Sequence, residues 1–396
     1  MKLLIVASYL PYPLHNGGHI RLYNLIKQLR DKHEITLICE MRPKQTQADL
    51  AMLAKLCQKV ITVPRRKQWS LQNILRSGLL SEPFLITGHT LPLMREAIAR
   101  ELASANYDLI HVETFYVIQN VPKTDVPIVL VEHNIEYLIY QRYAQNAPFF
   151  LRPLLQIDVQ KIKKAEEKSW QRATEVVAVS QADKAIINMK NCFVVANGVD
   201  MLQFQLKQLD PNFPSRLKTI LFIGDYSYIQ NRDAASFIIR EVWPLLKAKG
   251  RFKLWIVGRN MPRSLKDLGG QDHEILFDDN NPKPTPQIFS EADILLAPIR
   301  VGGGTSYKII ESMAVGTPVV TTSLGYEGIE VTKNKDILVG DTPQELARLI
   351  LHILSDKKDY QILSKASRVA VEKKYDWSVI ASDLEAVYHK AVKGDT

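Results

Sequence analysis

The chain has little cysteine and no long apolar run. Its three cysteines, Cys39, Cys57 and Cys192, show neither the paired spacing of a disulfide framework nor that of a metal site. We therefore expect a reducing, cytoplasmic setting in which the thiols are buried packing groups. No segment contains the roughly 18 consecutive apolar residues that a membrane-spanning helix requires. What is present is an ordinary globular composition, 46% hydrophobic and 23% charged, and the length of 396 residues predicts two domains.

Acidic residues are sparse in one half only. Residues 1–199 hold 25 Lys and Arg against 17 Asp and Glu, a net charge of +8, whereas the remainder holds 26 against 25. No DNA- or RNA-binding motif accompanies the basic residues and no run of aromatics interleaves them, so we expect no nucleic-acid partner. An anionic membrane surface would explain the asymmetry.

Two segments of the basic half combine apolar anchors with cations, as interfacial segments do. They are residues 65–69 and residues 149–155, the latter leading to Lys161, Lys163 and Lys164. The alternative is a solvated helix whose apolar side lies in the core. The membrane interpretation predicts peripheral attachment to the inner face of the membrane.

Short apolar segments alternate with amphipathic helical patterns along the whole chain. Expected strands are residues 3–8, 34–39, 59–63, 109–112, 128–132, 175–179 and 192–195, then 220–223, 253–257, 273–277, 294–297 and 319–322. Expected helices include residues 18–30, 153–172, 234–246, 307–314 and 343–354. This alternation predicts an α/β protein with two Rossmann-like domains, each a doubly wound parallel sheet.

Turn-forming residues 197–200 and the polar, proline-bearing stretch 205–218 mark the domain boundary. We predict an N-terminal domain over residues 1–200 and a C-terminal domain over residues 201–396. The final helix is a candidate to pack back on the N-terminal domain.

The densest group of functional signals lies in residues 298–320. An apolar strand ends where this run begins, and Gly302, Gly303 and Gly304 free the next turn sterically. Thr305 can then cap the helix that follows. Backbone N–H groups at such a turn and at a helix N-terminus are suited to a phosphate.

Lys308 and Glu311 follow on that helix. They are three residues apart and so share one face, where an ammonium for phosphate oxygens lies beside a carboxylate that can accept from two ribose hydroxyls. The alternative is a glycine turn before a helix whose polar residues are merely solvated. The whole pattern indicates a nucleotide-diphosphate site.

The longer run, Gly-Gly-Gly-Thr-x-x-Lys-x-x-Glu-x-Met-Ala-x-Gly-x-Pro-Val-Val, is matched at every position from residue 302 to residue 320. It resembles the donor-binding signature of the group 1 family of retaining glycosyltransferases. The resemblance implies the GT-B architecture, in which two Rossmann-like domains face a cleft, with a nucleotide-sugar donor held mainly by the C-terminal domain. Many members carry a first glutamate where this chain has Gly303, which points to a glycine-rich subgroup whose backbone amides face the sugar-phosphate.

The same resemblance extends to the N-terminal half. The proline-rich loop 11–18 ends in Gly17 and Gly18 and resembles the family's first loop, which contacts the donor phosphates; a plain loop with a helix cap is the alternative. His133 directly follows an expected strand, where open parallel sheets present ligand-contacting residues. A structural histidine is the alternative there, but the family histidine at this strand end lies near the transferred sugar. The resemblance therefore predicts that His133 lies near the transferred sugar. It gives only weak support for the same role at Glu136.

In many family members an arginine and a lysine bind the diphosphate. This chain has Asp225 and Asn231 at about those positions. Arg259 and Arg300 are the replacements that we consider, although either can be a surface residue. The acidic run 278–280 is better explained as a solvated loop than as a divalent-metal site. We expect no metal and no cofactor other than the nucleotide sugar as co-substrate.

The resemblance therefore predicts a retaining glycosyltransferase of the hexosyltransferase type. It would move a sugar from a nucleotide-diphosphate sugar to a glycan, lipid-linked or small-molecule acceptor in cell-surface polysaccharide or glycoconjugate synthesis. The alternatives are a nucleotide-sugar 2-epimerase and a non-catalytic sugar-nucleotide-binding protein. Predicted catalytic residues are His133, Lys308 and Glu311, and predicted donor-binding residues are Gly17, Gly18, Arg259, Arg300, Gly302, Gly303, Gly304 and Thr305.

Overall fold

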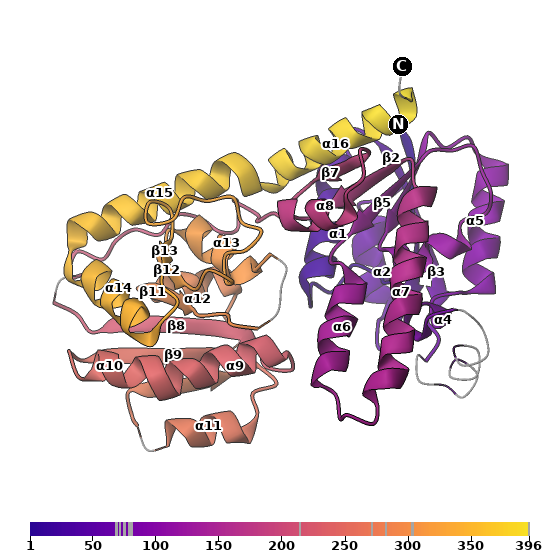
Figure 1. Cartoon of the computed structure of the whole chain (residues 1–396). Helices are drawn as coiled ribbons and strands as arrows, with labels where there is room; N and C mark the ends of the chain where they lie inside the picture. Colours follow the sequence, from indigo (N-terminus) through magenta and orange to yellow (C-terminus); the bar gives the residue numbers. More distant parts are fainter. Residues whose placement is uncertain are drawn as a thin grey trace. The chain divides into compact units, whose positions relative to one another are not determined.

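The computed structural model describes residues 1–67, 70, 73, 77, 82–213, 215–270, 272–281, 283–301 and 305–394. It divides into two compact units, the first made of Met1–Ala196 and the end of the chain from Ile380, the second of Asn197–Val379. Each unit is built on one parallel sheet with helices on its faces (Figure 1). The expected α/β class with two doubly wound parallel sheets is confirmed.

The first unit holds a seven-stranded sheet in the order β3-β2-β1-β4-β5-β6-β7. Its strands are β1 (Lys2–Ala7), β2 (Glu34–Met41), β3 (Lys59–Pro64), β4 (Leu109–Glu113), β5 (Ile128–Glu132), β6 (Glu175–Ala178) and β7 (Cys192–Val194). Its helices are α1 (Gly17–Leu29), α2 (Gln47–Ala54), α4 (Phe84–Thr87), α5 (Pro92–Ser104), the 3₁₀ helix η1 (Phe115–Asn120), α6 (Glu136–Asn146), α7 (Arg152–Arg172) and α8 (Gln181–Ile187). The strand order reverses between β1 and β4, and open parallel sheets bind ligands at the carboxyl ends of the strands beside such a reversal.

The second unit holds a six-stranded sheet in the order β10-β9-β8-β11-β12-β13. Its strands are β8 (Lys218–Asp225), β9 (Phe252–Arg259), β10 (Ile275–Asp279), β11 (Ile294–Ala297), β12 (Val319–Thr321) and β13 (Leu338–Val339). Its helices are α9 (Ile229–Phe237), the π-helix η2 (Ile238–Val242), α10 (Trp243–Lys247), α11 (Arg263–Gly269), α12 (Thr285–Glu291), α13 (Tyr307–Val315), α14 (Pro343–Ser355) and α15 (Lys357–Tyr375). Here the order reverses between β8 and β11. Figure 1 shows α9 and α10 on one side of this sheet and α12 and α13 on the other.

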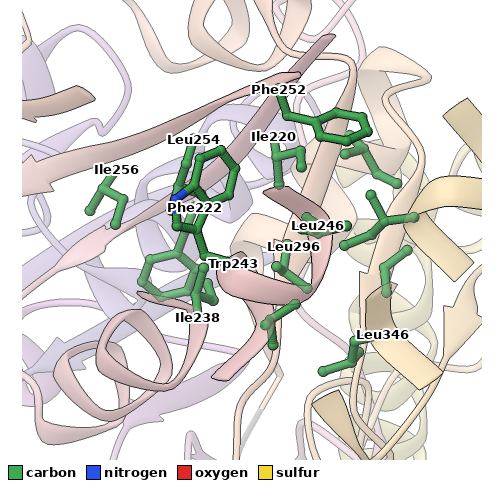
Figure 2. Packing of buried hydrophobic residues seen from close by; sticks show 14 of the residues in the cluster. Ile220, Phe222, Ile238, Trp243, Leu246, Phe252, Leu254, Ile256, Leu296 and Leu346 are labelled. Atoms are coloured by element: carbon green, nitrogen blue, oxygen red, sulfur yellow. The ribbon is translucent and has the colours of Figure 1, made fainter. Parts of the chain in front are cut away.

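Apolar strands buried on both faces hold each unit together, as parallel sheets covered by helices require. In the second unit Phe222, Leu254 and Leu296 come from three adjacent strands and pack in one cluster with Trp243 and Leu246 of α10 (Figure 2). Burial of side chains of this size stabilises the fold by about 1.5–3 kcal/mol each. The cluster fixes the strand ends from which the loops of the second unit emerge.

The last helix, α16 (Trp377–Lys393), begins in the second unit and belongs to the first from Ile380 onward. Within the first unit, the Glu385 carboxylate accepts from Lys32 Nζ at 2.6 Å and lies 2.9 Å from Nε2 of His33. No helix in the described ranges is long and apolar enough to cross a membrane.

Three sequence expectations differ from the structure. The single helix expected over 234–246 is instead α9, η2 and α10, because Pro244 has no N–H for the α-helical ladder and the preceding turn widens. The strand expected over 273–277 lies two residues further on, as β10. The two-residue strand β13 carries too short an apolar pattern to be predicted. The three cysteines are buried, as expected.

The two glycines that pair across β8 and β9, Gly224 and Gly258, approach each other closely. Gly258 has a φ of +147°, and a Cβ there would lie 1.8 Å from the Gly224 carbonyl oxygen. We predict that Gly258→Ala destabilises the second unit by about 3 kcal/mol or more, since backbone strain and overpacking each cost about 1–3 kcal/mol. Gly270→Ala is the control, because Gly270 has a φ of +55° but nothing within 4 Å of its added Cβ. Urea denaturation that gave equal losses for both variants would contradict the predicted clash.

Candidate active site

In the first unit, the loop after β1 leads into α1 at the reversal of strand order. Asn16 caps this helix, its side chain accepting from the backbone N–H of His19 at 3.0 Å. Arg21 is fully buried and donates to the carbonyls of Ala196 and Val195 at 2.6 and 2.9 Å, so α1 is held in place from within the unit. The first turn of α1, with Gly17 and Gly18, thus lies at the carboxyl end of the sheet, where a helix N-terminus suits an anion.

The structure brings Gly18 and His133 together. A Cβ at position 18 would lie 3.0 Å from the Tyr9 hydroxyl and 3.3 Å from Nδ1 of His133. An added Cβ would require the Tyr9 hydroxyl and the imidazole to shift by a few tenths of an ångström, so close packing favours glycine here. Gly17 is the first residue of the same helix.

Five side chains form what we call the Glu113 network: Tyr388, His111, Glu113, His133 and Tyr9, whose hydroxyl donates to Oε1 of Glu113 at 3.4 Å. Glu113, the last residue of β4, is fully buried, and its Oε1 lies 2.5 Å from Nε2 of His133. Its Oε2 lies 2.6 Å from Nε2 of His111, whose Nδ1 lies 2.6 Å from the Tyr388 hydroxyl on α16. The network thus reaches from α16 through the sheet to the end of β5.

The ionised carboxylate accepts hydrogen bonds and cannot donate them, so both imidazoles direct an Nε2 proton at Glu113. The other ring nitrogen of His111, Nδ1, is then the one that contacts the Tyr388 hydroxyl. Burial raises the pKa of Glu113, but the charge and hydrogen bonds of the two imidazoles outweigh it and hold that pKa well below its usual range. Glu113 therefore stays charged at neutral pH and fixes the orientation of His133.

Glu136 meets this network through the charge of His133, which lowers its pKa against the larger effect of burial. It is half-buried beside the buried carboxyls Glu132 and Glu166, and burial raises the pKa of all three. Glu166, whose pKa is raised to about 8, accepts from the backbone N–H of Glu136 at 2.8 Å and of Tyr137 at 3.1 Å. These contacts give the group a structural role at the start of α6.

In the second unit, α13 carries Lys308 and Glu311 on one face. Lys308 is half-buried; its Nζ donates to Oδ1 of Asn231 at 2.6 Å and lies 4.6 Å from the centre of the Phe222 ring. Burial lowers the pKa of Lys308 to about 7, although the Glu311 charge opposes this. Burial likewise raises the pKa of Glu311 to about 7 against the effect of Lys308. Among the described residues, Glu311 has no hydrogen-bond partner.

The start of α13 differs from expectation. The N-cap is Ser306 and not Thr305, and its side chain makes no capping hydrogen bond. Thr305 precedes the cap, so its hydroxyl cannot reach the first-turn N–H groups in the capping geometry. Its Oγ1 is buried and has no partner within the described part of the chain. Gly302, Gly303 and Gly304 lie outside the described residues.

The two arginines considered for the diphosphate both have carboxylate partners. Nε of Arg259 donates to Asp225 at 2.8 Å. Arg300 donates to both oxygens of Asp233, at 3.1 and 2.9 Å, and its guanidinium lies 4.0 Å from the centre of the Phe237 ring. Donor binding by either arginine stays a prediction. The guanidinium would have to contact the donor phosphate and its carboxylate partner at the same time.

The acidic run 278–280 is engaged in other contacts. Asp278 accepts from the indole N–H of Trp255 at 3.1 Å, and Asp279 pairs with Lys266 at 3.4 Å. Across the ranges that the structure describes, no three His, Cys, Asp or Glu side chains are grouped in a way that would hold a metal ion.

Comparison with known proteins agrees with the chemistry of both units. Residues 15–201 match the model of Glycosyltransferase Family 4, and residues 217–356 match that of Glycosyl transferases group 1. The chain belongs to the group 1 glycosyltransferase family. The two matches divide between the two units.

Relatives of this glycosyltransferase include phosphatidyl-myo-inositol mannosyltransferase from Mycolicibacterium smegmatis, 26% identical over 200 residues. That match covers 49% of this chain and 50% of the mannosyltransferase, so the chain spans about half the length of the curated relatives it matches first. Among solved structures, sucrose-phosphate synthase from Thermosynechococcus elongatus superimposes with a TM-score of 0.70 at 17% identity over 98% of both chains. HepE from Anabaena, in complex with UDP, superimposes with a TM-score of 0.69 at 16% identity, over 98% of this chain and 100% of the HepE chain. These two show the fold.

Sequence reasoning missed Glu113, His111 and Tyr388. Alternate residues of a strand lie on the same face, so His-x-Glu at the end of β4 places both ionisable groups together at the carboxyl edge of the sheet. That signal was available. No local pattern announces Tyr388, which lies 277 residues from His111.

Loss of the charge on Glu113 should disturb His133 without unfolding the protein. Glu113→Gln keeps the shape of the side chain but turns an N–H toward one imidazole. We expect turnover to fall by about 10–100-fold, the range seen when a partner that orients a metal-ligating histidine is removed. Nucleotide affinity should be unchanged. Glu132→Gln is the matched control on the neighbouring strand: burial raises the pKa of Glu132 well above its usual range, so glutamine replaces a neutral acid there. Equal losses of turnover in the two variants would refute an orienting role for the Glu113 charge.

Binding of a nucleoside diphosphate should protonate Lys308. With a pKa of about 7, this amine is mostly neutral at pH 8, and a diphosphate beside it would favour the ammonium. Calorimetric titration with UDP or GDP in buffers of different ionisation enthalpy should show uptake of up to about one proton at pH 8 and less at pH 6. Lys308→Met should abolish the uptake. Proton uptake that persists in Lys308→Met would exclude Lys308 as the group that titrates.

Proposed function

We propose that the protein is a retaining glycosyltransferase that uses a nucleotide-diphosphate sugar and works in the cytoplasm. The observation that carries the proposal is the pair Lys308 and Glu311 on one face of α13, beside the strand reversal of the second sheet. Within the described part of the chain, Lys308 has no carboxylate at ion-pair distance and Glu311 accepts no hydrogen bond, so the two side chains match a diphosphate and the hydroxyls of a ribose. The motif that contains them resembles the family's donor-binding signature.

The proposed chemistry is electrostatic. When the anomeric carbon–oxygen bond to the diphosphate breaks, negative charge grows on the leaving oxygen. Lys308, the Thr305 hydroxyl and the N-terminal amides of α13 would stabilise that charge more in the transition state than in the ground state. No metal ion is required in this scheme.

Retention follows if the acceptor attacks from the face that the diphosphate leaves. The new bond forms between the acceptor oxygen and the anomeric carbon, and the proton of the acceptor hydroxyl passes to the departing phosphate oxygen. His133 would lie near the transferred sugar, with its orientation fixed by Glu113, and Gly17 and Gly18 at the start of α1 would face donor phosphates.

The relatives suggest classes of substrate. HepE was solved with UDP, and the mycobacterial relatives are named for mannosyl transfer to phosphatidyl-myo-inositol. We propose a hexose donor on a nucleoside diphosphate, and an acceptor that is a glycan, a lipid-linked sugar or a small molecule. The product would serve cell-surface polysaccharide or glycoconjugate synthesis.

Two assays separate this proposal from its alternatives. Ligands that bind only the native state raise the melting temperature, so a thermal-shift screen of nucleotide sugars identifies the donor. Incubation of that donor with acceptors, followed by NMR of the product, should show a glycoside with the anomeric configuration of the donor. An epimerised sugar formed without acceptor would establish a 2-epimerase, and binding without turnover a non-catalytic protein; either overturns the proposal.

Glu311→Ala tests the ribose contact. We expect the variant to lose about 2–4 kcal/mol of donor binding or transition-state stabilisation, since hydrogen bonds to a charged group contribute about 1.5–3 kcal/mol each. Glu372→Ala on α15 is the control: Glu372 is exposed and pairs with Arg368 at 2.6 Å, and its loss should leave donor affinity and turnover unchanged. Donor affinity and turnover that stay at wild-type values in folded Glu311→Ala would remove Glu311 from the site.

A further inference from the structure

The α6–α7 hairpin of the first unit exposes an unusual number of large apolar side chains. Phe149 is 80% exposed, Phe150 and Leu154 are 67% exposed, and Tyr143 is 65% exposed. We call the hairpin tip the set of seven such residues in this hairpin: Ile139, Tyr143, Phe149, Phe150, Leu151, Leu154 and Ile157. Isolated exposed apolar residues are ordinary, but seven within 19 consecutive positions need an explanation.

The core does not account for the hairpin tip. α7 already has a buried face, formed by Val159, Ile162 and Trp170. Phe149 and Phe150 pack edge to face against each other, with ring centres 5.7 Å apart, in the turn between the two helices. In Figure 1 this turn is the end of the hairpin that lies away from the sheet. The interpretation of residues 149–155 as the core side of a helix is therefore wrong.

Charge distinguishes between the partners that could cover the tip. Residues 137–157 contain no Asp or Glu, while Arg142 and Arg152 are exposed among the apolar residues, and Lys164 and Lys168 are exposed further along α7. A two-fold contact with a second copy at the tip would bring Arg142 and Arg152 of both copies together, and residues 137–157 supply no carboxylate to pair with them. Anionic lipid headgroups supply the missing negative charge, and the acyl region below them accepts the rings.

We propose that the hairpin tip docks this protein on an anionic lipid bilayer. Phe149, Phe150 and Leu154 enter the boundary between headgroups and acyl chains, and the arginines and lysines contact lipid phosphates. Attachment is peripheral, and it depends on both apolar burial and charge. The inference is independent of the donor and acceptor proposed above. The other basic segment considered from sequence, residues 65–69, is only partly described, since Gln68 and Trp69 lie outside the described residues.

Co-sedimentation with vesicles tests the proposal. The full chain should bind vesicles of phosphatidylcholine mixed with phosphatidylglycerol, bind weakly to phosphatidylcholine alone, and be released at about 0.5 M NaCl, where charges are screened. The double variant Phe149→Ser, Phe150→Ser should lose about tenfold or more in vesicle partitioning. Leu202→Ser is the matched control, since Leu202 is 82% exposed on the second unit and should leave binding unchanged.

Melting temperatures of the variants confirm that they are folded, which is expected for exposed positions. Sedimentation velocity without lipid reports self-association. Indifference of the wild-type chain to anionic vesicles would overturn the proposal. So would equal binding by the double-phenylalanine variant, or a dimer that this variant abolishes while lipid binding is absent.

Discussion

The buried charge of Glu113 is the constraint around which the carboxyl edge of the first sheet is arranged. A carboxylate without access to water is very unfavourable unless it is paired and hydrogen-bonded. Here the partners come from the same strand and from the end of the next one, and His111 in turn binds Tyr388. One charge therefore fixes the orientation of His133 and anchors the last helix in the first unit. The fixed imidazole also crowds the space that a Cβ at residue 18 would occupy.

In the second unit, by contrast, the buried ionisable groups of α13 are not paired with each other. Lys308 and Glu311 share a face of α13, yet no ion pair joins them among the described residues, and burial moves the pKa values of both to about 7. A ligand that brings a negative charge to Lys308 and hydroxyl groups to Glu311 would stabilise the charged forms of both side chains. The first unit is thus preorganised by completed contacts, and the second holds polar groups whose partners a nucleotide would supply. This difference matches a protein whose second unit binds the donor.

The sequence predicted what depends on local patterns. Residues 128–132 and 294–297 were expected as strands with the bounds that β5 and β11 have, because continuous apolar runs ended by polar residues mark buried parallel strands. α13 was expected to within one residue, since its glycines and periodic apolar residues are local signals.

Long-range pairing could not be read in the same way. The contact of His133 with Glu113 joins the ends of two strands, and the pairing of Arg300 with Asp233 depends on where α9 packs. The cap at Ser306 in place of Thr305 depends on the path of the preceding turn. These features arise from tertiary packing, which no window of sequence contains.

The central claim is that α13 holds the nucleotide of the donor. A crystal structure of the protein with its best-stabilising nucleoside diphosphate tests it most directly. We predict that the ribose hydroxyls lie within hydrogen-bond distance of Glu311 and that the phosphates contact Lys308 and Thr305. A nucleotide bound elsewhere in the second unit, with Glu311 and Lys308 unchanged and unliganded, would contradict the account.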